Sequence, residues 1–464
     1  MANPIPLIAP KIVPPLDPDF RPASLANRTY RNDTMKDGVP LVIGLERNDG
    51  EISRFETKVF PEGHPNADRN FYYAERLVKF LLWQRGGWRV SIGGPRSIGE
   101  YIKQVYSPGG KRRFDYAFLG EQVYEQEFTV AICKADQVPP ARETGKPLGR
   151  HLEGCRIGFD LGASDRKVSA VVDGEAIFSE EVVWEPRKQS DPDYHYTEIM
   201  NALLTAASKL PRVDAIGGSS AGIYIDNRPM VASLFRGVPP ERYGEIKNLF
   251  ARIQQEFKVP LEVINDGDVT ALAGSMSLED NAILGIAMGS SEATGYVDPS
   301  GHIMGWLNEL SFAPVDYSPS APADEWSKDI GCGSMYFSQQ CVFRLAPKAG
   351  IQVPLDYTDA EKLKFVQEKL ETGHVGAEKI WQTMGIYLGY TLAHYADFYE
   401  IRHVLLLGRC TSGKGGDMIL NGANEVLRTE FPELASRIMV QLPDEKSRRV
   451  GQSIAAASLP AIQQ

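Results

Sequence analysis

The sequence has 464 residues with 50 basic and 60 acidic side chains, which give a net charge of −10, and 43% of its residues are hydrophobic. This balance is typical of a folded globular protein, and the negative charge argues against binding along a nucleic acid backbone. A spanning helix needs about 18 or more consecutive apolar residues, and the sequence contains no such run. The five cysteines never form a C-x-x-C pair, which favours a reducing compartment. We therefore expect a cytoplasmic protein that binds neither membranes nor nucleic acid.

The chain begins with a proline-rich stretch that we expect to form an extended arm over residues 1–30. Seven prolines stand within residues 1–22, and neither a basic start nor an unbroken apolar run indicates a signal peptide. Residues 31–150 are expected to form an additional N-terminal α/β module. A second proline-rich stretch, residues 137–154, is also charged and indicates a linker at the end of this module.

Inside the module, two β-rich runs meet at Asp49-Gly50, a dipeptide that suits the φ > 0 positions of a tight hairpin. Residues 67–85 place apolar side chains at helical spacing, and residues 88–106 have the pattern of a strand, a turn and a helix. Aromatic residues gather here, and they could stack on a sugar. At helical spacing, however, aromatic residues such as Trp83 are more often part of a core.

Beyond the linker, short apolar runs alternate with helical stretches. Three of these runs, residues 213–220, 261–266 and 403–408, end in small or polar residues. Strands that alternate with helices predict parallel sheets covered by helices, with ligands bound at the carboxyl ends of the strands. We therefore look for functional residues at these three ends.

Two further hairpins are expected, with turns at Asp173-Gly174 and at residues 298–301. The first strand of each runs into a turn of small residues, which is Gly162-Ala163-Ser164 in one case and Gly289-Ser290-Ser291 in the other. Such turns leave backbone N–H groups free to bind an anion. Both turns are therefore candidate phosphate sites.

Two aspartates end predicted strands. Asp160 stands just before the Gly162 turn, where its carboxylate could hold a hydrated Mg²⁺ beside phosphate oxygens, or could simply cap a hairpin. Asp266 follows Asn265 and precedes a helical stretch, so it could accept a proton from a bound hydroxyl or act as a helix N-cap. Asp268 could be the N-cap instead, which would leave Asp266 free.

Residues 408–414 match the G-x-x-x-x-G-K pattern of a P-loop after a predicted strand. The next residue is Gly415, where a P-loop has Ser or Thr to bind Mg²⁺, and the match lies near the end of the chain. The competing interpretation is a strand, turn and helix that bind another part of a nucleotide, such as its adenosine half.

Six segments resemble, in order and spacing, the ROK family of sugar kinases and sugar-responsive repressors. The resemblance covers about residues 155–460, and its segments are DLGASDRKVSAVVDG, GGSSAG, VINDGDVTALAG, AMGSSEATGYVD, LLLGRCTSGKGGDMI and VGQSIAAASLP. It implies a two-lobed α/β fold of the actin/hexokinase-like (ribonuclease H-like) class, with lobes at residues 151–275 and 276–464 after the N-terminal α/β segment. It also implies a homodimer.

The resemblance further implies a kinase that binds ATP and Mg²⁺ in an interlobe cleft and transfers the γ-phosphoryl group to a hydroxyl of a small-molecule carbohydrate. Asp266 would be the catalytic base, Asp160 would bind Mg²⁺, and Asn265 would bind the sugar. The other sugar contacts would be Ser220, Gly222 and Glu309. The nucleotide contacts would be Asp160, Gly162, Ala163, Ser164, Gly289, Ser290, Ser291, Gly408, Gly413 and Asp417.

The sequence departs from the family pattern at several positions. Phe312 stands where a histidine would contact sugar and structural zinc, and only Cys332 and Cys341 remain of a cysteine cluster, so we expect no structural zinc. Glu292 follows the second phosphate turn, where its charge would oppose phosphate unless the side chain turns away.

These departures leave a second hypothesis, in which a catalytically degenerate ROK fold binds sugar as a sensor or partner protein. The repressors of the family carry a winged helix-turn-helix at the N-terminus. Residues 31–150 instead open with a predicted hairpin and lack a basic recognition helix. We therefore do not expect a repressor.

Overall fold

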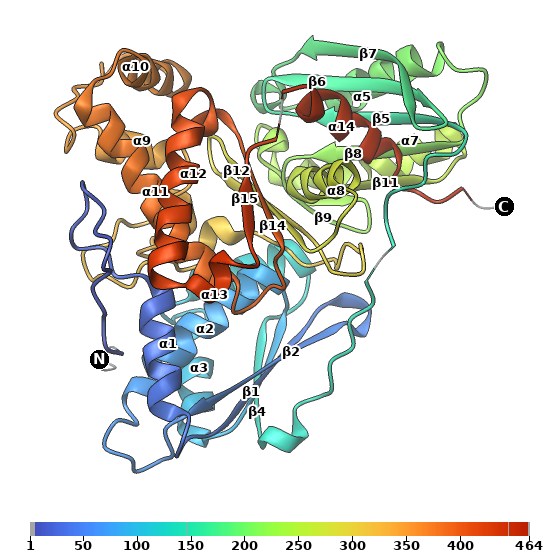
Figure 1. The fold of residues 1–464 in the computed structure, drawn as a ribbon. Helices are drawn as coiled ribbons and strands as arrows, with labels where there is room; N and C mark the ends of the chain where they lie inside the picture. Colours follow the sequence, from blue (N-terminus) through green and yellow to red (C-terminus); the bar gives the residue numbers. More distant parts are fainter. Residues whose placement is uncertain (1–4, 146, 444, 463–464) are drawn as a thin grey trace. The chain divides into compact units, whose positions relative to one another are not determined.

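The computed structural model describes residues 5–145, 147–443 and 445–462 (Figure 1). The chain divides into two compact units. Unit 1 comprises Met1–Thr144, Ile286–Thr294 and Gly305–Leu442, and unit 2 comprises Gly145–Gly285, Gly295–Met304 and Pro443–Gln464. The N-terminal module therefore belongs to the same compact unit as residues 305–442. No helix in the described part of the chain is both long and apolar enough to cross a membrane.

The N-terminal part of unit 1 is a four-stranded sheet packed against helices, and the sequence predicts most of it. The strands have the order β2-β1-β3-β4 and the bounds Val39–Glu46 (β1), Ile52–Val59 (β2), Arg89–Gly93 (β3) and Thr129–Cys133 (β4). The helices are α1 (Ala23–Thr34), α2 (Arg69–Arg85), α3 (Arg96–Val105), α4 (Arg113–Ala117) and a π-helix at Phe118–Tyr124. The hairpin at Asp49-Gly50 is confirmed, because both residues have positive φ and β1 pairs antiparallel with β2.

The expected arm is shorter than predicted. Helix α1 begins at Ala23, directly after Pro22, so residues 23–30 are helical rather than extended. Pro22 is the last proline of the stretch, and the residues after it can donate the backbone hydrogen bonds that a helix needs. Before it, the arm crosses unit 1 in an irregular conformation, and the Ile12 N–H donates to the Tyr390 hydroxyl at 3.1 Å.

A second four-stranded sheet has the order β13-β12-β14-β15. Most of it belongs to unit 1, but the first three residues of β12 and the last three of β13 belong to unit 2. Its strands are β12 (Ile283–Met288), β13 (Glu292–Val297), β14 (His403–Leu407) and β15 (Met439–Gln441). Its helices are α9 (Gln339–Leu345), α10 (Asp359–Glu371), α11 (Val375–Tyr395), α12 (Lys414–Glu430) and α13 (Pro432–Ala435). The turn expected at residues 298–301 is confirmed, because the Gly301 N–H donates to the Asp298 carbonyl at 3.0 Å and Gly301 has a φ of 84°. The second strand of the expected hairpin is wrong: β13 pairs instead with β12 across Gly289-Ser290-Ser291, and no strand element follows Gly301 before Gly305. The small residues already provide the tight turn.

Unit 2 is a five-stranded sheet of order β11-β8-β5-β6-β7. Its strands are β5 (Cys155–Leu161), β6 (Asp165–Val172), β7 (Glu175–Val183), β8 (Ala215–Ser220) and β11 (Leu261–Asn265), and β9 (Ile223–Ile225) pairs separately with β10 (Arg228–Val231). Its helices are α5 (Pro192–Ala207), α6 (Tyr243–Lys247), α7 (Leu249–Phe257), α8 (Asp266–Leu278) and α14 (Glu445–Ala457). Strands β5, β8 and β11 are parallel, whereas β6 and β7 form the predicted hairpin.

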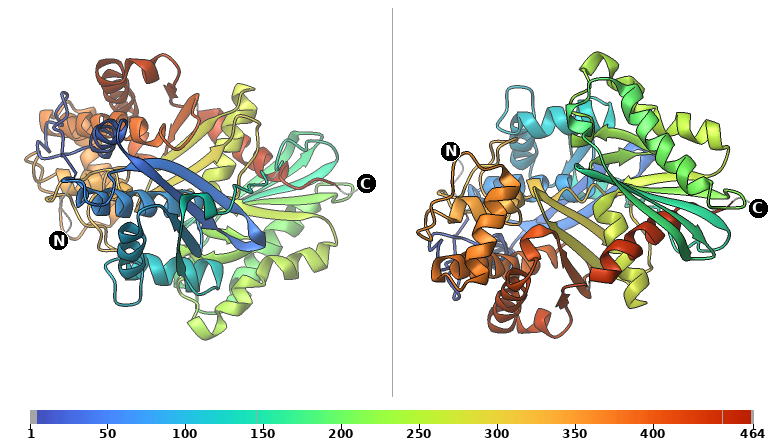
Figure 2. Two further views of the ribbon diagram at one scale, coloured as in Figure 1. Left: turned by 90° about the horizontal axis from the view of Figure 1, so that it is seen from below. Right: turned by 90° about the horizontal axis from the view of Figure 1, so that it is seen from above.

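The sheet of unit 2 is covered by helices on both faces (Figure 2). Ile157 and Phe159 of β5 belong to the core cluster that includes residues of α5 and α7. Gly158, between them in β5, points to the opposite face, where an added Cβ would lie 2.1 Å from the Ser453 carbonyl of α14. Glycine at this position therefore lets α14 approach the sheet closely.

Candidate active site

The carboxyl ends of the three parallel strands in unit 2 bring the two predicted aspartates to one edge of the sheet. Asp160 of β5 pairs in register with Ser219 of β8, and Asn265 of β11 pairs with Ser220 of β8. Asp266 follows Asn265 as the first residue of α8. Strand β8 lies between β5 and β11 in the sheet, so the two carboxylates flank its carboxyl end.

Asp266 is held at the start of α8 by its neighbour. The Asn265 side chain is the N-cap of the helix, because its Oδ1 accepts the Gly267 N–H at 2.7 Å. Neither aspartate is the cap, so the alternative in which Asp268 caps the helix is wrong: Asp268 lies inside the helix, and its Oδ1 accepts the Tyr296 N–H at 3.1 Å. Because Asn265 caps the helix, the Asp266 carboxylate has one oxygen bonded to the Gly267 N–H at 3.0 Å and keeps further acceptor capacity.

Burial and charge change the acidity of both aspartates. Burial, and then the negative charge of Asp160, raises the pKa of Asp266 to about 6. Burial also raises the pKa of Asp160, although the Ser219 hydroxyl, which donates to it at 2.7 Å, works in the opposite direction. A carboxylate with a pKa near neutrality is a suitable proton acceptor at physiological pH. Asp266 therefore has the acidity of a general base.

The predicted sugar contacts in β8 and the following turn have different surroundings. Ser220 is fully buried, and its hydroxyl accepts a hydrogen bond from Tyr224 at 2.6 Å. A direct sugar contact by Ser220 is therefore not available in this structure, because neighbouring chain covers it completely. Gly222 has a φ of 129° and its carbonyl accepts the Asn265 Nδ2–H at 2.8 Å, which fixes the amide.

The first candidate phosphate turn, Gly162-Ala163-Ser164, joins β5 to β6. The Gly162 N–H donates to the Asp165 carbonyl at 2.9 Å, and the Gly162 carbonyl accepts the Trp184 indole N–H at 2.9 Å. Ala163 and Ser164 are exposed. The turn is thus fixed at its base, with its tip open to solvent.

The second candidate turn, Gly289-Ser290-Ser291, lies in unit 1 and joins β12 to β13. Gly408 follows β14 with a φ of 93°, and a Cβ there would lie 2.5 Å from the Met288 carbonyl. The close approach brings the Gly408 turn beside the Gly289 turn. Ser290 and Ser291 are exposed.

The P-loop hypothesis does not fit the start of α12. The Lys414 N–H donates to a carboxylate oxygen of Glu371 at 3.1 Å, and the Lys414 ammonium donates to the Glu371 carbonyl at 3.0 Å. A protein carboxylate thus occupies the helix N-terminus where a P-loop would bind phosphate. Gly413, with a φ of 60°, and exposed Asp417 lie at the same end of α12. This favours the interpretation in which the turn binds an uncharged part of a nucleotide.

Glu309 and the two unusual residues near it also lie in unit 1. Glu309 is half-buried, and the Phe312 ring stacks on Trp83 with ring centroids 4.3 Å apart. Trp83 itself is fully buried, so the prediction that it belongs to the core is confirmed. Glu292 turns inward, because only 3% of it is exposed and its carboxylate accepts a hydrogen bond from the Tyr395 hydroxyl. Its charge therefore does not lie on the exposed tip of the phosphate turn.

Sequence reasoning missed the residues that support the two aspartates. Ser219 donates to Asp160, and its hydroxyl in turn accepts the Gln452 amide of α14 at 3.4 Å. Both residues lie inside segments of the family resemblance, GGSSAG and VGQSIAAASLP, yet only the fold brings them together. Trp184, which supports the Gly162 turn, lies just past β7 and had no local signal.

The described residues contain no group of three or more His, Cys, Asp or Glu side chains placed to hold a metal ion. Cys332 and Cys341 are both fully buried free thiols. Asp160 nevertheless offers the kind of ligand that Mg²⁺ uses, since this ion binds through one or two carboxylates together with substrate phosphates and water.

Comparison with known proteins identifies the fold. Scans of the sequence against protein-family models and against curated proteins find no match. Similar solved structures include the ROK hexokinase from Thermus thermophilus, with 16% identity, a TM-score of 0.51, and coverage of 65% of this chain and 97% of that one. A putative N-acetylmannosamine kinase from Listeria monocytogenes has 15% identity, a TM-score of 0.50, and coverage of 65% and 97%. A ROK family transcriptional regulator, a homologue of the E. coli Mlc protein, has 16% identity, a TM-score of 0.50, and coverage of 66% and 79%.

These matches show that the chain has the ROK fold of the actin/hexokinase-like class, as the sequence motifs predicted. The proteins that share this fold include both sugar kinases and a transcriptional regulator. Proteins that share this fold thus differ in function, so the fold alone does not give the function of this chain.

Proposed function

We propose that this protein is an ATP- and Mg²⁺-dependent kinase that transfers the γ-phosphoryl group to a hydroxyl of a carbohydrate. The observation that carries the proposal is the Asp266 carboxylate, fixed at the start of α8 with a pKa of about 6. Phosphoryl transfer to an alcohol needs one group that orients the hydroxyl and accepts its proton. The place of Asp266 at the carboxyl end of the parallel strands and its raised pKa support this role.

The other residues of unit 2 would bind and orient the acceptor. Asn265 has its amide fixed by the Gly222 carbonyl and the Gly267 N–H, and its remaining N–H and acceptor capacity would bind a sugar hydroxyl. Asp160 would hold Mg²⁺, whose positive charge neutralises the phosphate oxygens when the ion is bound. Ala163 and Ser164, at the open tip of their turn, would donate backbone N–H groups to phosphate.

Unit 1 carries further residues to which the family resemblance gives a role in nucleotide or sugar binding. Ser290 and Ser291 would bind phosphate from the exposed turn after β12, and the neighbouring residues Gly408, Gly413 and Asp417 would contact the adenosine half. Glu309 would accept hydrogen bonds from sugar hydroxyls. A carboxylate that accepts two adjacent hydroxyls is a strong and directional ligand for a carbohydrate.

The test is sugar-dependent release of ADP, measured with a panel of hexoses, amino sugars and polyols that includes glucose and N-acetylmannosamine. We expect Asp266→Asn to lower turnover about 10² to 10⁴-fold, since this is the usual contribution of a general base. The variant should keep the melting temperature of the wild type and its affinity for a non-hydrolysable ATP analogue. Asp165→Asn, which changes a carboxylate near the Gly162 turn, is the control. Full turnover by Asp266→Asn would show that another group is the base.

A sugar sensor without kinase activity is the second candidate, because one protein with this fold is a transcriptional regulator and Phe312 replaces an expected histidine. Calorimetry separates the two candidates. Sugar binding without measurable affinity for ATP in the presence of Mg²⁺ would favour the sensor, whereas affinity for both ligands would favour the kinase.

A further inference from the structure

The last turn of α2, in the N-terminal module, is hydrogen-bonded to the segment that carries Glu309. The Glu309 N–H donates to the Trp83 carbonyl at 2.9 Å, and the Asn308 N–H donates to the Gln84 carbonyl at 2.9 Å. The last carbonyls of a helix have no partner within the helix and need one elsewhere. Here they find it in residues more than 200 positions later in the chain.

The backbone at this contact is held in an unusual conformation. Asn308 has a φ of 50°, in the left-handed region that a residue with a side chain rarely occupies. Its Oδ1 accepts the Tyr399 hydroxyl at 2.9 Å, and its carbonyl accepts a hydrogen bond from the Thr294 hydroxyl. Such a conformation persists only where the surroundings determine it from several sides. The direction of the Glu309 side chain depends on this conformation.

A second contact lies one turn further along. The Phe312 ring stacks on Trp83 with centroids 4.3 Å apart and an angle of 29° between the planes. The Trp83 indole N–H donates to Asp115 at 3.0 Å. Trp83 therefore holds the Glu309 segment through both its carbonyl and its ring, and its own ring is fixed from the other edge.

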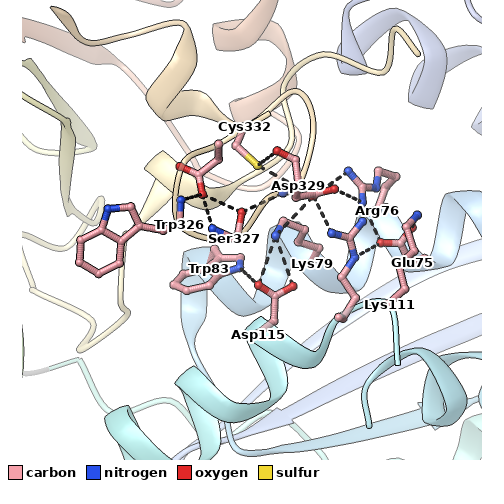
Figure 3. A network of polar contacts seen from close by, with 12 residues as sticks. Glu75, Arg76, Lys79, Trp83, Lys111, Asp115, Trp326, Ser327, Asp329 and Cys332 are labelled. Atoms are coloured by element: carbon pink, nitrogen blue, oxygen red, sulfur yellow. Dashed lines mark hydrogen bonds and ion pairs between the residues drawn. The ribbon is translucent and has the colours of Figure 1, made fainter. Parts of the chain in front are cut away.

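Helix α2 is itself anchored by a network of buried ion pairs (Figure 3). Lys79 is fully buried and lies 3.2 Å from Asp115 and 3.4 Å from Asp329. Arg76 approaches Asp329 to 3.0 Å and Arg112 approaches it to 2.7 Å. Buried ion pairs add little stability by themselves, but they fix geometry, because a displaced partner would leave a buried charge unpaired.

We propose that α2 is a positioning element for carbohydrate binding, with Trp83 and Phe312 as the positioning residues that orient the Glu309 carboxylate. The inference rests on the proposed function, in which Glu309 binds sugar hydroxyls. The N-terminal module thus serves the active site directly, although it lies far from Glu309 in the sequence. A module that served only to enlarge the hydrophobic core would not need hydrogen bonds to the backbone of Glu309, the residue proposed to bind sugar.

Amide hydrogen exchange, which needs no ligand, tests whether the Phe312 ring holds the backbone at residues 308 and 309. Phe312→Leu removes the stacked ring, and we expect the amides of residues 308 and 309 to exchange about five- to tenfold faster, with the rest of unit 1 unchanged. Phe312→Tyr keeps the ring and should restore slow exchange. Phe71→Leu is the matched control, because Phe71 lies on the same helix and its ring packs against Tyr101 instead. Unchanged exchange at residues 308 and 309 in Phe312→Leu would overturn the inference.

Steady-state kinetics test the functional half, with glucose or N-acetylmannosamine as the probe, whichever the wild type phosphorylates. Phe312→Leu should raise the KM for the sugar about tenfold and leave the KM for ATP unchanged, because one charge-assisted hydrogen bond is weakened. In a Glu309→Gln background the same substitution should have no further effect on the sugar KM. A loss of folded protein would instead lower the apparent kcat and leave the KM values of both substrates unchanged.

The outcomes are distinguishable from failure of the proposed function. If Phe312→Leu raises the sugar KM equally in the wild-type chain and in the Glu309→Gln background, the ring acts by some other route and the inference is wrong. If the wild type uses neither sugar and binds neither in calorimetry, the proposed function fails for these substrates and the role of Glu309 fails with it. The exchange measurement still decides whether α2 holds the segment.

Discussion

At the scale of single residues, Glu292 shows how burial removes a conflict that the sequence raises. Its carboxyl group lies inside unit 1, against Tyr395 and close to Gly333, where an added Cβ would lie 2.2 Å from its Oε2. No donor in the described part of the chain bonds that oxygen. Burial, aided by the negative charge of Glu309, raises the pKa of Glu292 to about 8. A carboxyl group with this pKa is mainly protonated at neutral pH.

This shift makes the stability of the protein depend on pH in a defined direction. The pKa of Glu292 rises on folding from its ordinary value of 4.5 to about 8, so the folded state favours the protonated form. The stability that this group contributes is complete below pH 4.5 and is lost as the pH rises through 8. Because glutamine does not ionise, Glu292→Gln should lose about 3 to 4 kcal/mol less stability than the wild type between pH 5 and pH 8.

Urea unfolding at the two pH values measures this difference. Exposed Glu121→Gln is the control, and it should follow the wild type at both pH values. Parallel losses of stability in the wild type and in Glu292→Gln would mean that the Glu292 carboxyl is already ionised in the folded protein at pH 5.

At the scale of elements, the N-terminal arm acts as part of the core of unit 1. Phe20 is fully buried, and its ring lies 4.7 Å from Tyr387 and 6.1 Å from both Tyr336 and Tyr390. Three residues earlier, Asp17 accepts a hydrogen bond from Tyr387 and lies 3.4 Å from Arg344. The arm therefore contributes an aromatic side chain and a charge that α9 and α11 need.

Removing the Phe20 ring should destabilise unit 1 strongly. We expect Phe20→Ala to lower the free energy of unfolding by about 3 to 5 kcal/mol, the usual cost of truncating a buried aromatic side chain. Ile8→Ala, at a position in the same arm that is 38% exposed, should change it by less than about 1 kcal/mol. Denaturant unfolding followed by tryptophan fluorescence measures both. Equal effects of the two substitutions would show that the arm is not packed as described.

Single helices and strands are easier to predict from the sequence than the distant segments that pack against them. Apolar spacing predicts α2 and the strands at β8, β11 and β14, because a helix or a strand end leaves a local pattern in the sequence. The small residues of the Gly289 turn indicate an anion site, but the sequence does not show that this turn joins β12 to β13, because the later Gly301 turn carries an equally strong signal. The contact between α2 and Glu309 has no local pattern, since it depends on which distant segments pack together.

At the scale of the whole molecule, chain order and compact units do not coincide. Unit 2 is assembled from three stretches of chain, the last of which is Pro443–Gln464. The expected boundaries at residues 151 and 276 treat each lobe as one continuous stretch, because composition marks linkers but not a return of the chain. The late motif VGQSIAAASLP was recognised, yet only the structure shows that it forms α14 and packs beside the first strand of unit 2.

The packing of α14 on the sheet depends on glycines in strands far from it in the sequence. At Gly217 of β8 an added Cβ would lie 1.7 Å from the Ala456 carbonyl, so even one methyl group would displace the helix. Ala456 and Leu459 are fully buried in a cluster with Val269 and Leu272 of α8, which the displacement would disturb. The final segment thus completes unit 2 only where the strands have no side chains.

Gly217→Ala should therefore destabilise unit 2 by about 1 to 3 kcal/mol, the usual cost of overpacking a core. Gly244→Ala is the matched control: Gly244 lies in α6, an added Cβ meets nothing within 4 Å, and alanine favours the helix, so its stability should stay equal or rise slightly. Hydrogen exchange should show the loss of Gly217→Ala concentrated in α14, β5 and β8, with unit 1 unchanged. Equal stability of the two variants would mean that α14 does not pack on this face of the sheet. The hydrogen bond from Gln452 of α14 to Ser219, beside Asp160, would then also be wrong.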